Sequence, residues 1–394
     1  MSEGILALNI GSSSIKLAVF ETTRLFPIAR GGITDLGPAA QATFTSAADP
    51  LPSTAPAAPG SSDIREAIAW LLGELHQREP ALQITAVGHR VVHGGTRFDA
   101  PVRIDARVLA ELEALAPLAP LHQPIALAAI RGMQDLLPQV PQVACFDTAF
   151  HHTQAKLSRW FALPRELGEA GIVRIGFHGL SYEYIAGALP GIAGARAHGK
   201  VVVAHLGHGA SLCAMCDLRS VSTSMGFTPL DGLMMATRCG ALDPGVLLYL
   251  QQHRGMSAQD VSDLLYNRSG LLGVSGISGD VRVLEASGDP RAHEALDMFA
   301  ERAAAAIASQ CVMLDGLDAL VFTGGIGEHS AATRRRICER LRWLGVALDS
   351  DANLRHAQCI STDTAAVCVF MIPTDEEAAI ARGTSRALGL SSGG

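Results

Sequence analysis

This sequence predicts an α/β protein of two domains. Three apolar runs each lead into a glycine-rich turn, and the first two turns lie half a chain apart. A buried strand that runs into such a turn exposes several backbone N–H groups close together, which can bind a phosphate. The chain has 394 residues, 48% of them hydrophobic, and is too long for one ordinary core. We therefore expect a duplicated nucleotide clamp with its ligand cleft between two domains. The three turns are 11–14, 207–209 and 324–327.

Hydrophobic runs that end in glycine or polar residues predict the strands of both halves. The expected strands are 5–8, 15–20, 84–87, 142–146 and 173–177, and then 201–205, 211–215, 317–323 and 367–372. Helical patterns cover 63–77, 106–115 and 124–136, and helices dominate up to residue 315. Residues 36–62 are rich in Ala, Pro, Ser and Thr, which predicts an irregular excursion with room for short edge strands.

The charge pattern argues against a nucleic acid partner. The net charge is −7, and the Lys and Arg residues are scattered along the chain. The densest basic run, Arg334–Arg336, is expected to form a solvated helix face rather than a phosphate-binding patch.

The sequence shows neither a signal peptide nor an apolar stretch long enough to span a bilayer, so we expect a cytoplasmic protein without membrane contact. The longest apolar candidate, 303–314, is interpreted as a buried helix. Eight dispersed cysteines are expected to be reduced thiols. Cys213 and Cys216 have redox-motif spacing, but they lie within an apolar run, which favours packed thiols.

Several polar residues stand at the ends of predicted strands, where α/β proteins place their chemistry. These residues are Asn9, Arg90, Asp147, His178, His205 and Thr323. Taken singly, each has a structural role as its simpler explanation. Together with the glycine turns, they suit phosphoryl transfer, which needs positioning, a metal ion and positive charge around the moving group. The chain contains no G-x-x-x-x-G-K-[ST] motif, so a P-loop is excluded.

Candidate residues exist for each task. Lys16 follows the first turn and can meet a phosphate as a point charge. Asn9 and Glu376 offer oxygen ligands of the kind that Mg²⁺ prefers. Arg90 and Arg238 can hold a carboxylate or a phosphoryl group with their planar forks, and His178 can donate a hydrogen bond to a transferring oxygen. A zinc site at the pair of His89 and His93, or of His205 and His208, lacks further ligands.

Eight ordered motifs resemble those of the acetate kinase family, from Ile5 to about residue 386. They are Asn-x-Gly-Ser-Ser-Ser-x-Lys, Gly-His-Arg-Val-Val-His-Gly-Gly, Pro-Leu-His-x-Pro, Phe-Asp-Thr-Ala-Phe-His, Gly-Phe-His-Gly, Ser-Met-Gly-Phe-Thr-Pro-Leu-x-Gly-Leu-Met-Met, Phe-Thr-Gly-Gly-Ile-Gly-Glu and Pro-Thr-x-Glu-Glu. The resemblance implies a duplicated ribonuclease H-like fold of the actin/Hsp70/sugar-kinase type and a homodimer. It also implies phosphorylation of acetate to acetyl phosphate by ATP with Mg²⁺, or with Mn²⁺ as an alternative metal. We expect an N-terminal domain at 1–147 with about 376–394, and a nucleotide-binding domain at 148–375.

The resemblance also assigns roles to individual positions. Asn9 and Glu376 would hold the magnesium, and Lys16 would bind the nucleotide phosphates. Asp147, His178, Arg238 and Arg90 would be the catalytic residues. The residues expected to bind ATP are His205, Leu206, Gly207, His208, Gly209, Asp280, Val281, Arg282, Gly324, Gly325, Ile326, Gly327 and Glu328. The pocket for the methyl group would consist of Val92, Leu121, Phe177 and Pro229, together with Arg90.

Physical chemistry qualifies one of these roles. A carboxylate substrate has a pKa of roughly 4, so it is already ionised near neutral pH and needs no general base. We therefore interpret Asp147 as a residue that aligns an arginine or a metal-bound water. The two arginines separate a carboxylate from the γ-phosphate, whose repulsion amounts to several kcal/mol at an effective dielectric of about 20.

The sequence departs from the family pattern at three positions. His208 stands where Asn is usual, and it could weaken ATP binding or make that binding depend on pH. Leu180 and Tyr182 replace Thr and His, which removes expected polar contacts near His178. Val92 matches an acetate preference, although a propionate or butyrate kinase would share every catalytic residue. A non-catalytic ATP-binding protein of this superfold would need the glycine turns but not the arginines and the apolar pocket together.

Overall fold

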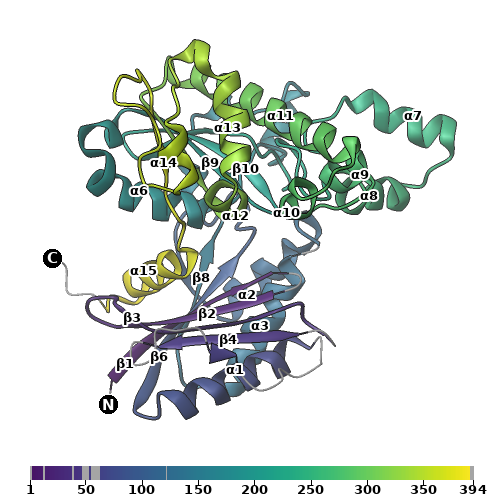
Figure 1. The fold of residues 1–394 in the computed structure, drawn as a ribbon. Helices are drawn as coiled ribbons and strands as arrows, with labels where there is room; N and C mark the ends of the chain where they lie inside the picture. Colours follow the sequence, from purple (N-terminus) through teal and green to yellow (C-terminus); the bar gives the residue numbers. More distant parts are fainter. Residues whose placement is uncertain are drawn as a thin grey trace. The chain divides into compact units, whose positions relative to one another are not determined.

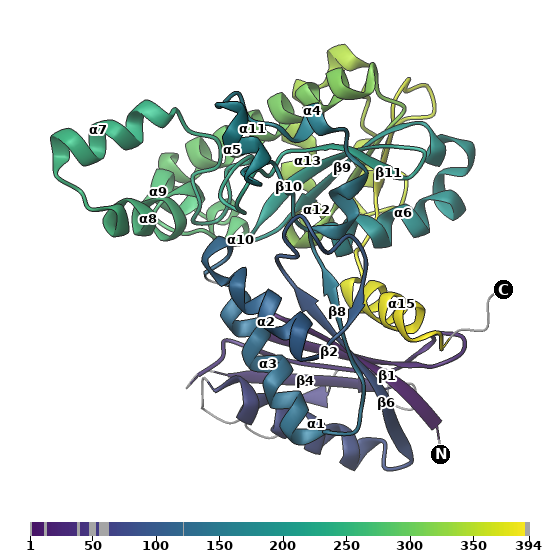
Figure 2. The same ribbon diagram turned by 180° about the vertical axis from the view of Figure 1, so that it is seen from behind.

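The computed structural model describes residues 2–11, 14–37, 40–46, 53–54, 63–120 and 122–390, and these form two compact units (Figures 1 and 2). Unit 1 comprises Met1–Phe150, Gly179–Tyr184 and Asp375–Gly394, and unit 2 comprises His151–His178 and Ile185–Thr374. The inclusion of Gly179–Tyr184 in unit 1 has no counterpart in the predicted domain boundaries.

Unit 1 is built on a sheet in the order β5-β4-β3-β2-β1-β6-β8-β7. Neighbours from β1 to β5 pair antiparallel, whereas β1, β6 and β8 are parallel. The strands are β1 (Ser2–Ile10), β2 (Ser14–Glu21), β3 (Pro27–Thr34), β4 (Gln41–Ser46), β5 (Ser53–Thr54), β6 (Leu82–Val91), β7 (Val102–Arg103) and β8 (Gln142–Phe146).

Strand alternation explains how helices cover both faces of this sheet. Leu6 and Leu8 of β1 pack in one core with residues of α1 (Ile64–Arg78) and α3 (Gln123–Leu136). Ile5 and Ala7 point to the opposite face and pack with residues of α15 (Glu376–Leu388). The C-terminal helix thus returns to the first strand, which places Glu376 in the same unit as Asn9. The described residues of unit 1 also form α2 (Ala106–Ala114).

Unit 2 contains a sheet in the order β11-β10-β9-β12-β13, and its long helix α11 (Pro290–Leu314) packs against β9 and β10. The strands are β9 (Lys200–Leu206), β10 (Ala210–Cys216), β11 (Arg219–Thr223), β12 (Ala319–Thr323) and β13 (Cys368–Met371). The other helices are α4 (Lys156–Arg159), α5 (Arg165–Glu169), α6 (Gly179–Ala193, which begins in unit 1), α7 (Pro244–Arg254), α8 (Ala258–Asn267), α9 (Gly270–Ser275), α10 (Val281–Glu285), α12 (Gly324–His329), α13 (Ala331–Arg340) and α14 (Ser350–Leu354).

Both sheets share one topology, which confirms the duplicated α/β fold. In each unit, three antiparallel strands are followed by two parallel ones, giving β3-β2-β1-β6-β8 in unit 1 and β11-β10-β9-β12-β13 in unit 2. The first and second glycine turns lie at the same place, between the first two strands of their unit. The first unit adds the edge strands β4 and β5 in the segment predicted to be irregular, and part of that segment lies outside the described residues.

Two sequence predictions are wrong. Residues 173–177 form no strand beyond an isolated bridge at Val173, since Gly176 has a positive φ of 81° that breaks an extended run. Arg334 is not solvated but fully buried. Its guanidinium donates to the carbonyls of Gly327, Glu328 and Asn353 and to Oδ1 of Asn353 at 2.7 to 2.9 Å, so neutral acceptors replace the lost water.

Other sequence predictions have mixed outcomes. The stretch 303–314 is helical, but Val312 is 79% exposed, so only one face of α11 is buried. Cys213 is a packed, free thiol, and burial raises its pKa to about 12. Cys216 is also free but exposed. Among the described residues, no helix combines the length and apolar character needed to cross a membrane.

Candidate active site

Arg90 and Asp147 form a buried ion pair in unit 1. Nε and Nη2 of Arg90 donate to Oδ2 of Asp147 at 3.0 and 2.7 Å. The two residues come from β6 and from the turn after β8, which are parallel neighbours. Burial alone would lower the pKa of Arg90, but the charges of Asp147 and Glu376 outweigh it and raise that pKa. Burial raises the pKa of Asp147, and Arg90 opposes the rise.

Asn9, at the end of β1, joins this pair to two carboxylates of α15. Its Oδ1 accepts from Nη1 of Arg90 at 3.1 Å. Its Nδ2 donates to Oε2 of Glu376 at 2.8 Å and to Oε1 of Glu377 at 2.9 Å. The amide orientation is therefore fixed from both sides. Burial and the nearby Glu376 charge raise the pKa of Glu377, which was not among the predicted site residues.

An outer ion pair anchors the start of α15. Arg30 of β3 donates to both carboxylate oxygens of Asp375, whose Oδ1 also caps the helix through the backbone N–H of Ala378. Nη1 of Arg30 also lies 3.9 Å from Oε2 of Glu377. Neither Arg30 nor Asp375 was predicted, because their pairing joins residues 345 positions apart in sequence.

The other predicted residues of unit 1 are placed as follows. Lys16 is exposed on β2, directly opposite Asn9 in the β1–β2 pairing. Val92 is buried just after β6. Leu121 lies outside the described residues.

His178 of unit 2 is held in a left-handed backbone conformation at the start of α6, with φ 60° and ψ 24°. A residue other than glycine is uncommon there, and its strained backbone persists only where the surroundings hold it. Nδ1 of His178 lies 2.8 Å from the hydroxyl of Ser211, and its ring stacks on that of His205 at 4.4 Å between centroids. Ser211 was not predicted, although it follows the second glycine turn by two residues.

His178 and Arg238 both face the second glycine turn. A β-carbon placed on Gly209 would lie 3.1 Å from Nε2 of His178 and 3.7 Å from Nη1 of Arg238. Nη1 of Arg238 also donates to the carbonyl of Pro229 at 3.0 Å. The structure thus brings together three predicted elements that are separated widely in sequence. Phe177 and Pro229 are both buried within this unit.

The second and third glycine turns are neighbours. Thr323 of β12 pairs with His205 of β9, and a β-carbon on Gly207 would lie 3.8 Å from the backbone N of Gly325. Gly324 has a φ of 76°, and a β-carbon there would approach the carbonyl of Leu206 to 2.8 Å. Only glycine fits this close approach. The backbone N–H groups of the second and third turns therefore lie together, at the C-terminal ends of the neighbouring strands β9 and β12.

Glu328 accepts a hydrogen bond from the third turn. Its Oε1 accepts from the backbone N–H of Gly324 at 2.9 Å and from that of Thr374 at 3.1 Å. This carboxylate therefore braces the turn, and the nucleotide contact expected for Glu328 stays a prediction. Gly325 is exposed, whereas Gly324 and Gly327 are buried.

Asp280 and Arg282 lie at the start of α10. Asp280 caps the helix by accepting from the backbone N–H of Arg282, and it also pairs with the guanidinium of Arg282 at 2.6 Å. That pairing lowers the pKa of Asp280. Val281 between them is buried. The preceding Gly279 lies against the carbonyl of Ala236, which places this segment beside the loop of Arg238.

The three positions that depart from the family pattern differ in surroundings. The side chain of His208 is only partly exposed at the tip of the second turn. Partial burial, and then the positive charge of Arg238, lower its pKa, which favours the neutral ring at neutral pH. Leu180 and Tyr182 are both buried, so these positions contribute to packing.

The carboxylates at the start of α15, those of Glu376 and Glu377, suit a magnesium ion that is held by one protein carboxylate. Mg²⁺ usually keeps several waters and uses one or two protein carboxylates together with phosphate oxygens. Glu376 provides such a carboxylate. Asn9, the other predicted ligand, donates to Glu376 through Nδ2, and its oxygen accepts from Arg90 instead of facing that carboxylate. Among the described residues, no group of three or more His, Cys, Asp or Glu side chains forms a complete metal cage.

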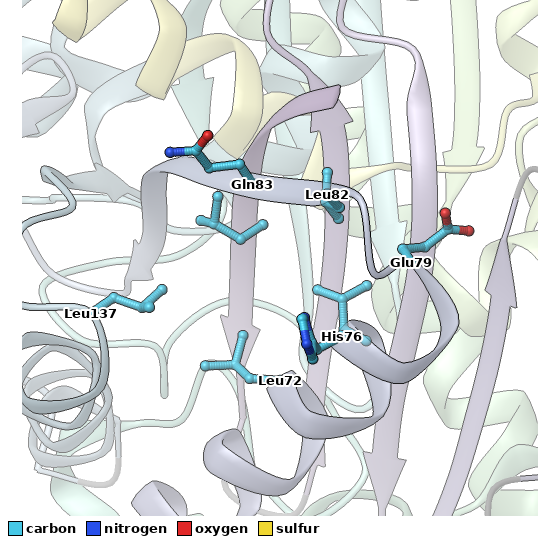
Figure 3. A pocket seen from close by; sticks show the side chains of 8 residues that line it. Leu72, His76, Glu79, Leu82, Gln83 and Leu137 are labelled. Atoms are coloured by element: carbon cyan, nitrogen blue, oxygen red, sulfur yellow. The ribbon is translucent and has the colours of Figure 1, made fainter. Parts of the chain in front are cut away.

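A separate pocket of about 310 Å³ lies in unit 1, away from these residues (Figure 3). Leucines of α1 and the start of β6 form its wall, with polar side chains at its margin. The lining residues are Leu72, Leu75, His76, Glu79, Leu82, Gln83, Ile84 and Leu137. None of them belongs to the predicted site.

The duplicated fold with polar residues and glycine turns at its strand ends defines a protein of the phosphotransferase class. Residues 4–382 match the acetokinase family. The chain is 53% identical over 391 residues to an acetate kinase of Rhodopseudomonas palustris, which covers 97% of this chain and 98% of that protein. The chain belongs to the acetokinase family, and it is an acetate/propionate kinase-type enzyme for which the family implies ATP as co-substrate.

Solved structures agree with this assignment. A propionate kinase from Francisella tularensis subsp. tularensis SCHU S4 superposes with a TM-score of 0.90 at 36% sequence identity. The match covers 98% of this chain and 100% of that chain. An acetate kinase from Porphyromonas gingivalis gives a TM-score of 0.86 at 35% identity, with the same coverage. The relatives therefore include kinases named for either acid.

Proposed function

We propose that this enzyme transfers the γ-phosphoryl group of ATP to acetate, reversibly and in line, forming acetyl phosphate and ADP. The observation that carries this proposal is the approach of His178 and Arg238 to Gly209. Two hydrogen-bond donors beside backbone N–H groups form an arrangement that stabilises charge on a transferring phosphoryl group. The neighbouring third turn and the Asp280–Arg282 segment would bind the rest of the nucleotide.

The residues of unit 1 would handle the acid and the metal. Arg90 presents a fixed positive charge, because Asp147 and Asn9 hold its guanidinium in one plane. That charge would receive the acetate carboxylate. Glu376, oriented by Asn9, would hold Mg²⁺ or Mn²⁺, which when bound neutralises phosphate charge. Lys16 would contact the nucleotide phosphates as a point charge.

Proton transfer plays no part in this scheme. The acetate carboxylate is ionised near neutral pH, so the nucleophile is ready without a base. Asp147 contributes by fixing Arg90. The donor at His178 would be Nε2, since Nδ1 is engaged with Ser211.

Acetate is proposed as the preferred acid because the apolar candidates are bulky and buried. Val92, Phe177 and Pro229 are all buried in their own units. One extra methylene in a pocket of fixed size changes specificity by about 1–3 kcal/mol. Propionate is expected to react more slowly, and butyrate more slowly still.

We also propose that the enzyme is a homodimer that uses α7 as part of its contact surface. None of the residues Pro244–Arg254, all of which the structure describes, is buried. Leu248 and Tyr249 are 54% and 52% exposed, and Leu242 before the helix is 42% exposed. Helix α7 projects outward from α8 and α9 in both views of unit 2 (Figures 1 and 2). Such an exposed apolar helix suits pairing with a second copy. Light scattering should give twice the chain mass for the wild type and a monomer for Leu248→Asp.

Trapping the acyl phosphate as a hydroxamate tests the main proposal. Acetate, propionate and butyrate are each incubated with the enzyme, Mg²⁺ and ATP. We expect the largest kcat/KM with acetate. No product from any acid would overturn the kinase assignment to this chain, and a preference for propionate or butyrate would overturn the choice of acetate.

A further inference from the structure

The backbone that carries His178 is a strained elbow, defined here as Gly176–His178. Gly176 has a φ of 81° and His178 a φ of 60°. The left-handed region costs about 1–3 kcal/mol for a residue other than glycine, so surrounding contacts must hold it. The family motifs assign no role to the residue that makes the principal contact, His151.

His151 donates a hydrogen bond to the middle of this elbow. It lies in the 3₁₀ turn Ala149–Thr153 and is only 1% exposed. Its Nε2 is 3.0 Å from the carbonyl oxygen of Phe177, the residue before His178. A carbonyl oxygen only accepts, so Nε2 of His151 must carry the hydrogen.

The opposite ring nitrogen is fixed as the acceptor. Nδ1 of His151 lies 2.9 Å from the hydroxyl of Ser220, which in turn accepts from Nε2 of Gln154 at 2.9 Å. Burial lowers the pKa of His151 to about 4, so the ring stays neutral at physiological pH. One tautomer is therefore locked, and it is the tautomer that can bind the Phe177 carbonyl.

The His151 ring also fills the space beside Gly176. A β-carbon on Gly176 would lie 2.5 Å from Cδ2 and 2.7 Å from Cγ of His151. It would also lie 2.8 Å from Cγ2 of Thr223 on β11. The side chain of His151 therefore donates a hydrogen bond to Phe177 and also packs against Gly176. The imidazole of His178 is held separately through Ser211 on β10.

We propose that His151 is a positioning residue for phosphoryl transfer, which holds the elbow so that Nε2 of His178 faces Gly209. The inference rests on the donor role proposed above for His178. His151 itself touches neither substrate in this scheme. Its loss would misplace the His178 donor, and a misplacement of about 1 Å can cost roughly 100-fold in rate.

Two substitutions separate shape from hydrogen bonding. His151→Phe keeps a ring beside Gly176 but has no donor for the Phe177 carbonyl. His151→Gln keeps an N–H donor and an acceptor on a flexible chain. We expect His151→Phe to lower kcat by roughly 10- to 100-fold with KM for ATP changed less than about twofold, and His151→Gln to recover most of that loss.

A matched control and a double mutant test whether the effect passes through His178. Leu296→Ala removes a buried side chain of α11 and should lower the melting temperature without changing kcat. If His151 acts through His178, the double variant His151→Phe/His178→Ala should have the same kcat as His178→Ala alone. Additive losses, or a His151→Phe variant with wild-type kcat, would overturn the inference.

The control experiments also separate this inference from the proposed function. Near-normal turnover in His178→Ala would remove the donor role, and both proposals for His178 would fall. A large loss in His178→Ala with normal turnover in His151→Phe would leave the donor role standing and refute the positioning role alone. Should His151→Phe not fold, Ser220→Ala, which removes the hydroxyl 2.9 Å from Nδ1 of His151 and leaves the 3.4 Å contact of Gln154, is expected to show a smaller loss of kcat in the same cycle, and additivity there would refute the proposal.

Discussion

Arg90 and Asp147 are joined through a single oxygen. Nε and Nη2 of the guanidinium both reach Oδ2 of the carboxylate, at 3.0 and 2.7 Å. This geometry leaves Nη1 for Asn9 and fixes the plane of the guanidinium at the end of β6. The carboxylate is 2% exposed, so its partner cannot be replaced by water without cost.

Asp147→Asn tests whether this carboxylate aligns or accepts a proton. The amide keeps an acceptor oxygen but loses the charge opposite Arg90, so we expect kcat to fall by roughly 10- to 100-fold. The shape of the pH–rate profile should stay the same, because the substrate needs no base. Selective loss of the ionisation on the acidic side of that profile, where a base gains its proton, would show that Asp147 takes a proton.

Replacing either arginine should remove turnover while sparing the nucleotide. Arg90→Ala and Arg238→Ala are each expected to lower kcat by roughly 100-fold or more, because the acetate carboxylate then lacks Arg90 or the phosphoryl group then lacks Arg238. Calorimetric ADP affinity should change little in Arg90→Ala. Arg335→Ala serves as a control that should leave kcat unchanged, since Arg335 is exposed and pairs with Glu339. A variant of Arg90 or Arg238 that works at the wild-type rate would contradict its assignment.

His208→Asn should reveal a pH effect confined to acid. Burial and Arg238 lower the pKa of His208, so the ring is neutral at pH 7 and above and gains a proton only as the pH falls below the usual value of about 6.5. ATP affinities of the two proteins should therefore run parallel from pH 7 to 8. In acid, the wild type should bind relatively more tightly, because protonation adds positive charge. A ratio of affinities that drifts between pH 7 and 8 would disprove this.

Buried neutral histidines should make the fold sensitive to acid. Burial lowers the pKa values of His89, His93 and His151 to about 4. The unfolded chain protonates near pH 6.5, so stability is complete above that value and is lost as the pH falls from about 6.5 towards 4. His89→Gln removes one of the three histidines that take up a proton on unfolding in acid. Urea unfolding followed by circular dichroism should show a smaller loss between pH 7 and 5 in that variant than in the wild type.

The sequence predicted the strands that are local apolar runs, whereas β3 and β11, which are richer in glycine or polar residues, were not predicted. Residues 142–146 form β8 as expected, and the turn after β9 lies where its glycines predicted it, whereas residues 324–327 after β12 belong to the helix α12. The family motifs also identified residues that the structure gathers, such as Arg90 with Asp147 and His178 with Arg238. Local pattern and motif order were sufficient for these features.

Partners from distant parts of the chain escaped prediction. Arg334 stands in a basic run that looks solvated, yet carbonyls at the end of α12 and Asn353 receive its guanidinium. The elbow before His178 looks like a strand because Ile175 and Phe177 are apolar, but Gly176 turns the backbone. Nothing in the spacing of Ser211, Ser220 or His151 reveals that they meet around that elbow. Such pairings depend on tertiary placement rather than on local sequence.

The carboxylate of Glu328 ties the Gly324 turn to Thr374, the last residue of unit 2 before the chain enters α15. The loop proposed to bind the nucleotide therefore also holds the backbone at Thr374, where the chain leaves unit 2. A pull on the C-terminal end of unit 2 therefore acts on this hydrogen bond as well as on β13. Nucleotide that stiffens the loop should then raise the unfolding force of the unit, and Glu328→Ala should weaken that link.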